Sequence, residues 1–142
     1  MTDQPSHTPK TLSLSEANAL LPIVKPLIEQ LQQLQRVIAQ TNQQIDELTV
    51  KVSAGNGYPV QSLKARLHEL TTHQLQLAEA FESALAQLED AGAMLKDLQR
   101  GLIDFYALRD GKLVVLCWTL GEERIRYWHT LEDGFAGRQP LD

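Results

Sequence analysis

The stretch SAGNGYP, residues 53–59, separates two long segments that carry the same periodic pattern of apolar residues. Its two glycines, its asparagine and its proline are residue types that stop a helix and turn the chain. Each flanking segment repeats apolar residues in steps of three and four, which predicts a helix with one buried seam. We therefore expect a long antiparallel two-helix coiled-coil hairpin over residues 12–98, with its turn at residues 53–59.

The seams of the two predicted helices can be aligned about this turn. The first seam consists of Leu20, Val24, Leu27, Leu31, Leu34, Ile38, Thr41, Ile45, Leu48 and Val52. The second seam consists of Leu63, Leu67, Leu70, Gln74, Leu77, Phe81, Ala84, Leu88, Ala91 and Leu95. Antiparallel alignment places Thr41 opposite Gln74, and a slip by one heptad would oppose each polar residue to an aliphatic one. We expect this polar layer to specify the register of the hairpin.

The first helix is predicted to begin at a capping box. Ser13 stands three residues before Glu16, and at this spacing each side chain can accept a hydrogen bond from the other residue's backbone N–H. The preceding residues 1–11 are polar and contain two prolines, which favours a flexible lead-in. The length of the chain then predicts a single domain over residues 12–142.

Short apolar runs separated by turn signals replace the heptads in residues 99–142. The runs GLIDFYAL (101–108), LVVLCW (113–118) and RIRYWH (124–129) predict a three-stranded antiparallel meander. The middle run is apolar on both faces, so we expect the hairpin to cover one face and a partner or the C-terminal tail to cover the other. The predicted fold class is therefore α+β, mainly α, with the small sheet near the base of the hairpin.

Composition excludes several classes of protein. The net charge of −5, with no basic cluster, argues against nucleic-acid binding. No apolar run approaches the roughly 18 to 20 residues that cross a bilayer, which predicts no membrane segment, and the first residues lack the pattern of a secretory signal. The single cysteine, Cys117, cannot form an internal disulfide, which fits a reducing compartment. We expect a cytoplasmic protein.

Three parts of the sequence resemble a known family. They are LSLSEANALLP (12–22), KDLQRGLIDFYALRDGKLVVLCW (96–118), and the tail elements YWH (127–129), DGFAGR (133–138) and PL (140–141). The chain in this respect resembles the uncharacterised bacterial proteins grouped as domain of unknown function 2203. The resemblance implies a bacterial cytoplasmic protein with similar boundaries, and it assigns no catalytic role to any residue.

His129 and Trp128 fall on opposite faces of the third predicted strand, because side chains alternate along a strand. Imidazole and carboxylate groups bind divalent metal ions. The candidate metal ligands are therefore His129, Glu132, Asp133 and Asp104. A hydrogen-bonded structural histidine is the alternative, because no second histidine lies nearby in the sequence. Cys117 lies inside the apolar middle strand, and we interpret it as part of the core rather than as a nucleophile.

Arginine and aromatic residues suggest a second kind of site, for an anionic or planar ligand. The residues concerned are Arg109, Arg124, Arg126, Arg138, Tyr106, Trp118, Trp128 and Phe135. Guanidinium groups bind carboxylate and phosphate, and aromatic faces stack on planar groups. Ion pairs are the alternative, because acidic and basic residues nearly balance in this part of the chain.

Two functions are consistent with these patterns. We expect a non-enzymatic binding or scaffold protein that engages a protein partner through the hairpin and forms a homodimer through the hairpin base and the sheet. The alternative is a small-molecule or metal-binding protein, enzymatic or not. Its candidate site residues are Asp104, Arg109, Trp128, His129 and Arg138.

Overall fold

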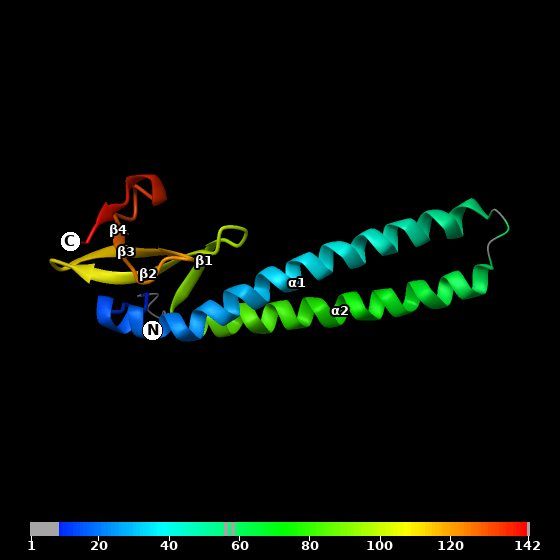
Figure 1. The fold of residues 1–142 in the computed structure, drawn as a ribbon, viewed down its shortest axis with the longest axis horizontal. Coiled ribbons are helices and arrows are strands. Elements are labelled where there is room, and N and C mark those ends of the chain that lie inside the picture. The colour runs from blue at the N-terminus through cyan, green and yellow to red at the C-terminus, as the bar shows by residue number, and fades with distance from the viewer. Residues whose placement is uncertain (1–8, 56, 58, 142) are drawn as a thin grey trace, which may run out of the picture. The chain divides into compact units, whose positions relative to one another are not determined.

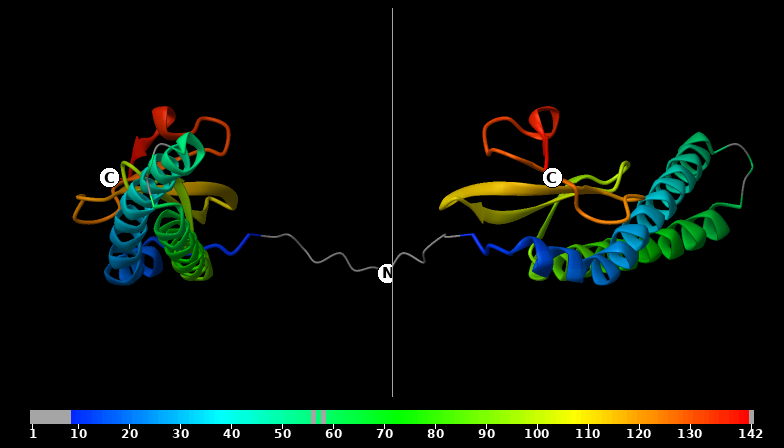
Figure 2. Two further views of the ribbon diagram at one scale, coloured as in Figure 1. Left: turned by 90° about the vertical axis from the view of Figure 1, so that its right-hand side faces the viewer. Right: turned by 60° about the vertical axis from the view of Figure 1, so that its left-hand side comes forward.

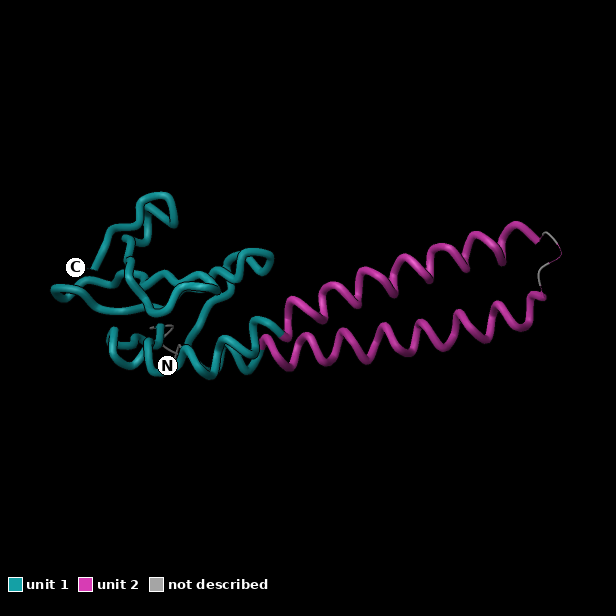
Figure 3. The backbone as a smooth tube through the Cα atoms, in the orientation of Figure 1, with its two compact units in different colours: residues 1–29, 86–142 teal, residues 30–85 magenta. Residues whose placement is uncertain are grey.

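The computed structural model describes residues 9–55, 57 and 59–141. Outside these ranges lie most of the predicted lead-in (residues 1–8), two residues of the predicted turn (Asn56 and Tyr58) and Asp142. Contacts divide the chain into two compact units, which Figure 3 colours separately. One unit contains residues 30–85, and the other combines the segments on either side of it.

The unit of residues 30–85 contains parts of two long helices that pack together, α1 (Leu14–Ala54) and α2 (Val60–Asp90) (Figure 1). This confirms the predicted helical hairpin. Among the described residues of this unit, the buried ones all lie on the predicted seams, and they are Leu31, Thr41, Leu70, Leu77 and Ala84. In the described part of the chain, no helix is both long enough and apolar enough to cross a membrane.

The predicted polar layer contains two residues whose hydrogen bonds go to different partners. Thr41 is 4% exposed, and its hydroxyl donates to the Val37 carbonyl at 2.8 Å. The side-chain amide of Gln74 donates to Asn42 Oδ1 on the facing helix at 2.6 Å. Both polar groups therefore have a partner.

Replacing Thr41 by valine should stabilise the helical unit. Valine keeps the β-branched shape but removes a buried hydroxyl, and the Val37 carbonyl keeps its backbone partner in the helix. We expect the free energy of unfolding in urea to rise by about 1 kcal/mol. Thr49 is the matched control, because its hydroxyl makes the same bond to Ile45 at 2.7 Å but is exposed, so Thr49→Val should change little. A less stable Thr41→Val protein would contradict the prediction.

The other unit contains a five-stranded antiparallel sheet whose strands are adjacent in chain order. The strands are β1 (Ala93–Asp97), β2 (Leu102–Arg109), β3 (Lys112–Thr119), β4 (Tyr127–His129) and β5 (Gln139–Pro140). The predicted meander is present as β2, β3 and β4. The prediction of three strands was incomplete, because β1 and β5 extend the sheet at its two edges.

Residues 91–98, predicted as the end of the second helix, contain β1 with a turn before it and the start of a turn after it. Helix α2 ends at Asp90, and the N–H of Gly92 donates to the Glu89 carbonyl at 2.9 Å. Glycine commonly follows the last turn of a helix. Leu95 fits the heptad spacing, but it pairs with Ile103 on β2. The predicted hairpin boundary at residue 98 was therefore too late.

The predicted third strand is also shorter than expected, because β4 begins at Tyr127 instead of Arg124. The chain before β4 is held against helix α1, where the N–H of Ile125 donates to Asn18 Oδ1 at 2.8 Å. That backbone N–H is therefore committed to a helix side chain instead of to β3.

The start of α1 follows the capping-box prediction. The N–H of Ser13 donates to Glu16 Oε1 at 2.8 Å, and the N–H of Glu16 donates to Ser13 Oγ at 3.0 Å. The chain is paired earlier than predicted, because Thr11 forms a parallel bridge with Tyr106 of β2. The predicted lead-in of residues 1–11 is thus too long at its C-terminal end.

The two faces of the sheet have different covers, which Figure 2 shows from two sides. One face packs on the first part of α1, where Leu21 lies near Trp118 and Ile28 lies near Gly101. The buried residues of this part of α1 are Ala17, Leu21, Val24 and Ile28, and those on the sheet face of Trp118 include Ile103, Phe105 and Leu116. Residues 130–138, here called the C-terminal segment, cover the other face. The homodimer prediction assumed an open second face, and the C-terminal segment removes that reason for it.

Candidate metal centre

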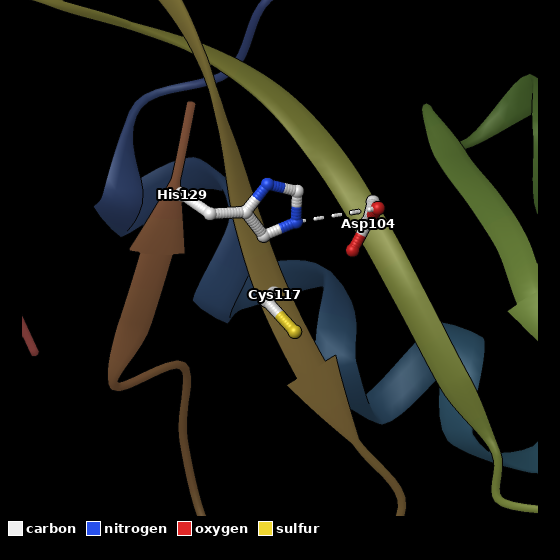
Figure 4. Close-up of side chains that lie close together, drawn as sticks. All are labelled: Asp104, Cys117 and His129. Atoms are coloured by element: carbon white, nitrogen blue, oxygen red, sulfur yellow. Dashed lines mark ion pairs between the residues drawn. The ribbon is translucent and has the colours of Figure 1, made fainter. Parts of the chain in front are cut away.

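Three side chains that carry metal-ligand atoms lie close together (Figure 4). They are on the face of the sheet that the C-terminal segment covers. Asp104 on β2 pairs directly with Cys117 on β3. His129 on β4 pairs with Val115, two residues before Cys117. Alternation along the strands therefore puts Asp104, Cys117 and His129 on one face. Each residue offers one ligand atom, and these atoms all lie within 4.8 Å of one another.

The imidazole of His129 is buried and oriented by the backbone. Its Nδ1 lies 2.7 Å from the carbonyl oxygen of Thr130. Because a carbonyl oxygen only accepts, Nδ1 carries the hydrogen and donates it. The other nitrogen, Nε2, faces Asp104 at 3.7 Å from Oδ2 (Figure 4). Histidines that bind metals commonly donate one ring N–H to a carbonyl in this way and bind the ion through the other nitrogen.

The carboxyl group of Asp104 is only partly satisfied. Its side chain is 7% exposed. Oδ2 faces His129, but Oδ1 has no hydrogen-bond partner among the described residues. Buried polar atoms in folded proteins nearly always have a partner. Asp104 therefore retains an unused acceptor that a cation or a donor group could occupy.

Burial also opposes ionisation of both acidic members of the cluster. It raises the pKa of the Asp104 carboxyl group, against the smaller opposing effects of the neighbouring His129 and Lys96. Burial raises the pKa of the Cys117 thiol to about 11, and the Asp104 carboxylate adds to this rise. Cys117 is thus a protonated thiol at neutral pH, which disfavours a role as nucleophile. A bound cation would reverse this balance, because it stabilises carboxylate and thiolate together.

A cavity of about 300 Å³ lies between this cluster and the C-terminal segment. Asp104 and His129 belong to its lining. Its remaining lining is largely apolar, with one lysine and one tyrosine, and consists of Met94, Lys96, Leu102, Tyr106, Val115, Leu131, Gly134 and Phe135. A small molecule in this cavity would therefore contact apolar groups and the polar cluster at the same time.

Two arginines stack on the aromatic residue that the C-terminal segment contributes to this cavity. The guanidinium carbon of Arg138 lies 4.3 Å from the ring centroid of Phe135 and 4.4 Å from that of Tyr127. The guanidinium carbon of Arg100 lies 4.6 Å from the Phe135 centroid. These cation–π contacts stabilise Phe135 in the cavity wall.

The five candidate residues named from sequence occupy three places. Asp104 and His129 belong to the buried cluster. Arg138 stacks on the wall residue Phe135. Arg109 and Trp128 lie together on the opposite face of the sheet, with the guanidinium carbon 4.7 Å from the indole ring centroid. The structure therefore does not bring all five residues to one site.

The other predicted metal ligands, Glu132 and Asp133, lie in the exposed turn after β4 and outside the cluster. The cluster instead contains Cys117, which we had interpreted only as a core residue. Cys117 is buried, but its side chain is on the same face of the sheet as Asp104, and its sulfur lies within 4.8 Å of the ligand atoms of Asp104 and His129 (Figure 4). The turn RDGK between β2 and β3 could have revealed this, because it sets the register that pairs Asp104 with Cys117.

Comparison with known proteins identifies the chain only at the level of its family. The model of the family described as "uncharacterized conserved protein (DUF2203)" matches residues 10–141. The chain therefore belongs to the DUF2203 family, in agreement with the resemblance seen in the sequence. Comparison with curated proteins and with solved structures found no match.

Proposed function

We propose that this DUF2203 protein binds a divalent transition-metal ion of the zinc class through Asp104, Cys117 and His129. The observation that supports this most directly is the buried Oδ1 of Asp104, which has no partner among the described residues, in a cluster of three ligand types. A cation at this position would give that oxygen a partner. It would also offset the burial that raises the pKa of Asp104 and of Cys117.

The ligand set favours zinc over magnesium or calcium. Thiolate and imidazole suit zinc-class ions, whereas magnesium and calcium prefer oxygen ligands. Tetrahedral zinc with bonds of about 2.0 to 2.3 Å separates its ligand atoms by roughly 3.4 Å. The ligand atoms here lie within 4.8 Å, so small side-chain movements would complete the site.

Three protein ligands leave one tetrahedral position open, as in zinc sites that take water or a small molecule. Because Asp104 and His129 also line the cavity, a ligand in the cavity could reach an ion that these residues hold. We therefore place the function of the site in metal-dependent binding of a small molecule. A cytoplasmic location is part of this proposal, because cytosolic reductants keep a free thiol reduced and able to bind a metal.

Titration of the metal-free protein with Co²⁺ tests the proposal. Co²⁺ is a spectroscopic substitute for zinc, and thiolate coordination produces a charge-transfer absorption. Cys117 is the single cysteine, so any such band must come from it. We expect one equivalent of Co²⁺ to produce the band and one equivalent of Zn²⁺ to remove it.

Matched histidine variants sharpen this test. His129→Ala should weaken Co²⁺ binding by roughly 100-fold, because it removes one of three ligands and about 2.7 kcal/mol of binding free energy. His68→Ala is the control, because His68 is exposed on helix α2 outside the cluster, and it should leave the titration unchanged. A protein that produces no thiolate band, or a His129→Ala protein that titrates normally, would refute the metal site.

A protein-binding role is the second candidate, and exposed apolar residues of the helical unit favour it. Val50 is 67% exposed and Leu75 is 63% exposed. Apolar side chains on a helix surface can contact a partner. The Co²⁺ titration separates the two candidates, because a purely protein-binding role predicts no thiolate band.

A further inference from the structure

We propose that the cavity binds a small organic acid, with its oxyanion at the open position of the metal and beside Lys96, and its apolar part against Met94, Leu131 and Phe135. This names the ligand class for the same cavity and therefore rests on the proposed metal site. Carboxylate and phosphate groups share the necessary chemistry, because both coordinate zinc-class ions through oxygen and pair with ammonium groups.

Positive charge gathers at this cavity although the whole chain has a net charge of −5. Lys96 is part of the lining. Arg100 and Arg138 stack on Phe135, which is also part of the lining. In the described part of the chain, no ion pair joins any of these three cations to a carboxylate. A bound cation would add to this field, so anions would be attracted to the cavity.

The remaining lining indicates what else the ligand contains. Met94, Leu131 and Phe135 lie around the cavity, and Leu131 is 52% exposed. A volume of about 300 Å³ is at the lower end of ligand pockets. This combination fits a short aliphatic or aromatic acid better than an inorganic anion, because the apolar wall would gain contacts only from the former.

Addition of acids to the Co²⁺-loaded protein tests the inference. Coordination of an anion at the open position should change the visible absorption of the bound Co²⁺. We expect acetate, butanoate and hexanoate to bind progressively more tightly, by roughly fourfold per methylene group. Hexanamide should not bind, because it lacks the negative charge, and inorganic phosphate should bind more weakly than hexanoate. Equal binding of hexanamide and hexanoate, or tighter binding of phosphate, would overturn the inference.

Two variants and one control test which part of the cavity wall contacts which part of the ligand. Lys96→Gln should weaken hexanoate about fivefold and leave the Co²⁺ band intact, since an exposed ammonium contributes about 1 kcal/mol. Lys112→Gln is the control, because Lys112 is exposed and lies outside the cavity, and it should leave the binding of hexanoate unchanged. Leu131→Ser should weaken hexanoate but not acetate.

The outcomes separate this inference from the proposed function. If the absorption of the Co²⁺-loaded protein does not change when any of the acids is added, the proposed ligand class is wrong and the proposed metal site is unaffected. A protein that never binds Co²⁺ overturns the metal site itself, and with it the inference.

Discussion

Replacement of Asp104 by asparagine should make the metal-free protein more stable at neutral pH and should abolish its stabilisation by zinc. Asparagine has nearly the same shape but no charge to bury, and its amide can donate to Nε2 of His129. We expect the free energy of unfolding of the metal-free variant to exceed that of the natural protein by on the order of 1 to 3 kcal/mol. This is the usual cost of burying a polar group that lacks a partner. Zinc at 100 times its dissociation constant should raise the free energy of unfolding of the natural protein by about 2.7 kcal/mol, and it should not raise that of the variant. Urea unfolding with and without zinc would measure both effects.

The pH dependence of this difference follows from the pKa of Asp104. Burial raises the pKa in the folded protein above the ordinary value of 3.8, so the folded state keeps its proton to higher pH than the unfolded chain. The contribution of Asp104 to the stability of the metal-free protein is therefore most favourable below pH 3.8, and it is lost as pH rises through the folded-state pKa. The gain from Asp104→Asn should accordingly be smallest in acid and should grow as pH rises through the folded-state pKa of Asp104.

Asp46→Asn provides the control, because Asp46 is exposed on helix α1, and it should behave like the natural protein in every condition. A metal-free Asp104→Asn protein that is less stable than the natural one at pH 7 would contradict the argument. It would mean that the contact between Asp104 and His129 stabilises the fold by more than burial of the carboxylate destabilises it.

Local signals explain which elements could be predicted from the sequence. Heptads, the capping box at Ser13 and the turn at residues 53–59 depend on neighbours in the chain, so they predicted the helical hairpin. The prediction failed where the apolar spacing continues beyond the helix, since Ala91 and Leu95 keep the heptad spacing although α2 ends at Asp90. Strand β5 has two residues, which is too short to leave a pattern.

The candidate site depended more strongly on contacts between distant segments. Alternation along one strand was enough to separate His129 from Trp128. Alternation alone could not show that Cys117 faces Asp104, because the middle strand is apolar on both faces and only its register with β2 identifies the polar neighbour. The cavity could not be predicted, because it forms when the C-terminal segment folds back over the sheet.

Gly101→Ala should be strongly destabilising, because Gly101 is both conformationally constrained and tightly packed. Its φ is +69°, and a Cβ atom there would lie 2.5 Å from Cβ of Leu120. The left-handed conformation costs an alanine about 1 to 2 kcal/mol, and overpacking adds about 1 to 3 kcal/mol. We expect a loss of roughly 3 kcal/mol in the free energy of unfolding, measured in urea at pH 7.

A substitution at Gly111 separates the conformational cost from the cost of overpacking. Its φ is +78°, but nothing lies within 4 Å of the position that a Cβ atom would occupy. Gly111→Ala should therefore cost only about 1 to 2 kcal/mol, the conformational part. Equal losses at both positions would show that the chain around Leu120 moves away at little cost.

The identity of the clashing atom makes a stricter test possible. Because the contact is with Cβ of Leu120, trimming that side chain to alanine leaves the clash in place, and Leu120→Ala should not rescue Gly101→Ala. Leu120→Gly removes the atom and should recover part of the loss, reduced by roughly 1 kcal/mol for the added backbone freedom. Movement of the backbone is also opposed, because the N–H of Leu120 donates to the Gly101 carbonyl at 3.0 Å. Gly101 stands directly before β2, so the same contact keeps the strand that carries Asp104 in register with β3.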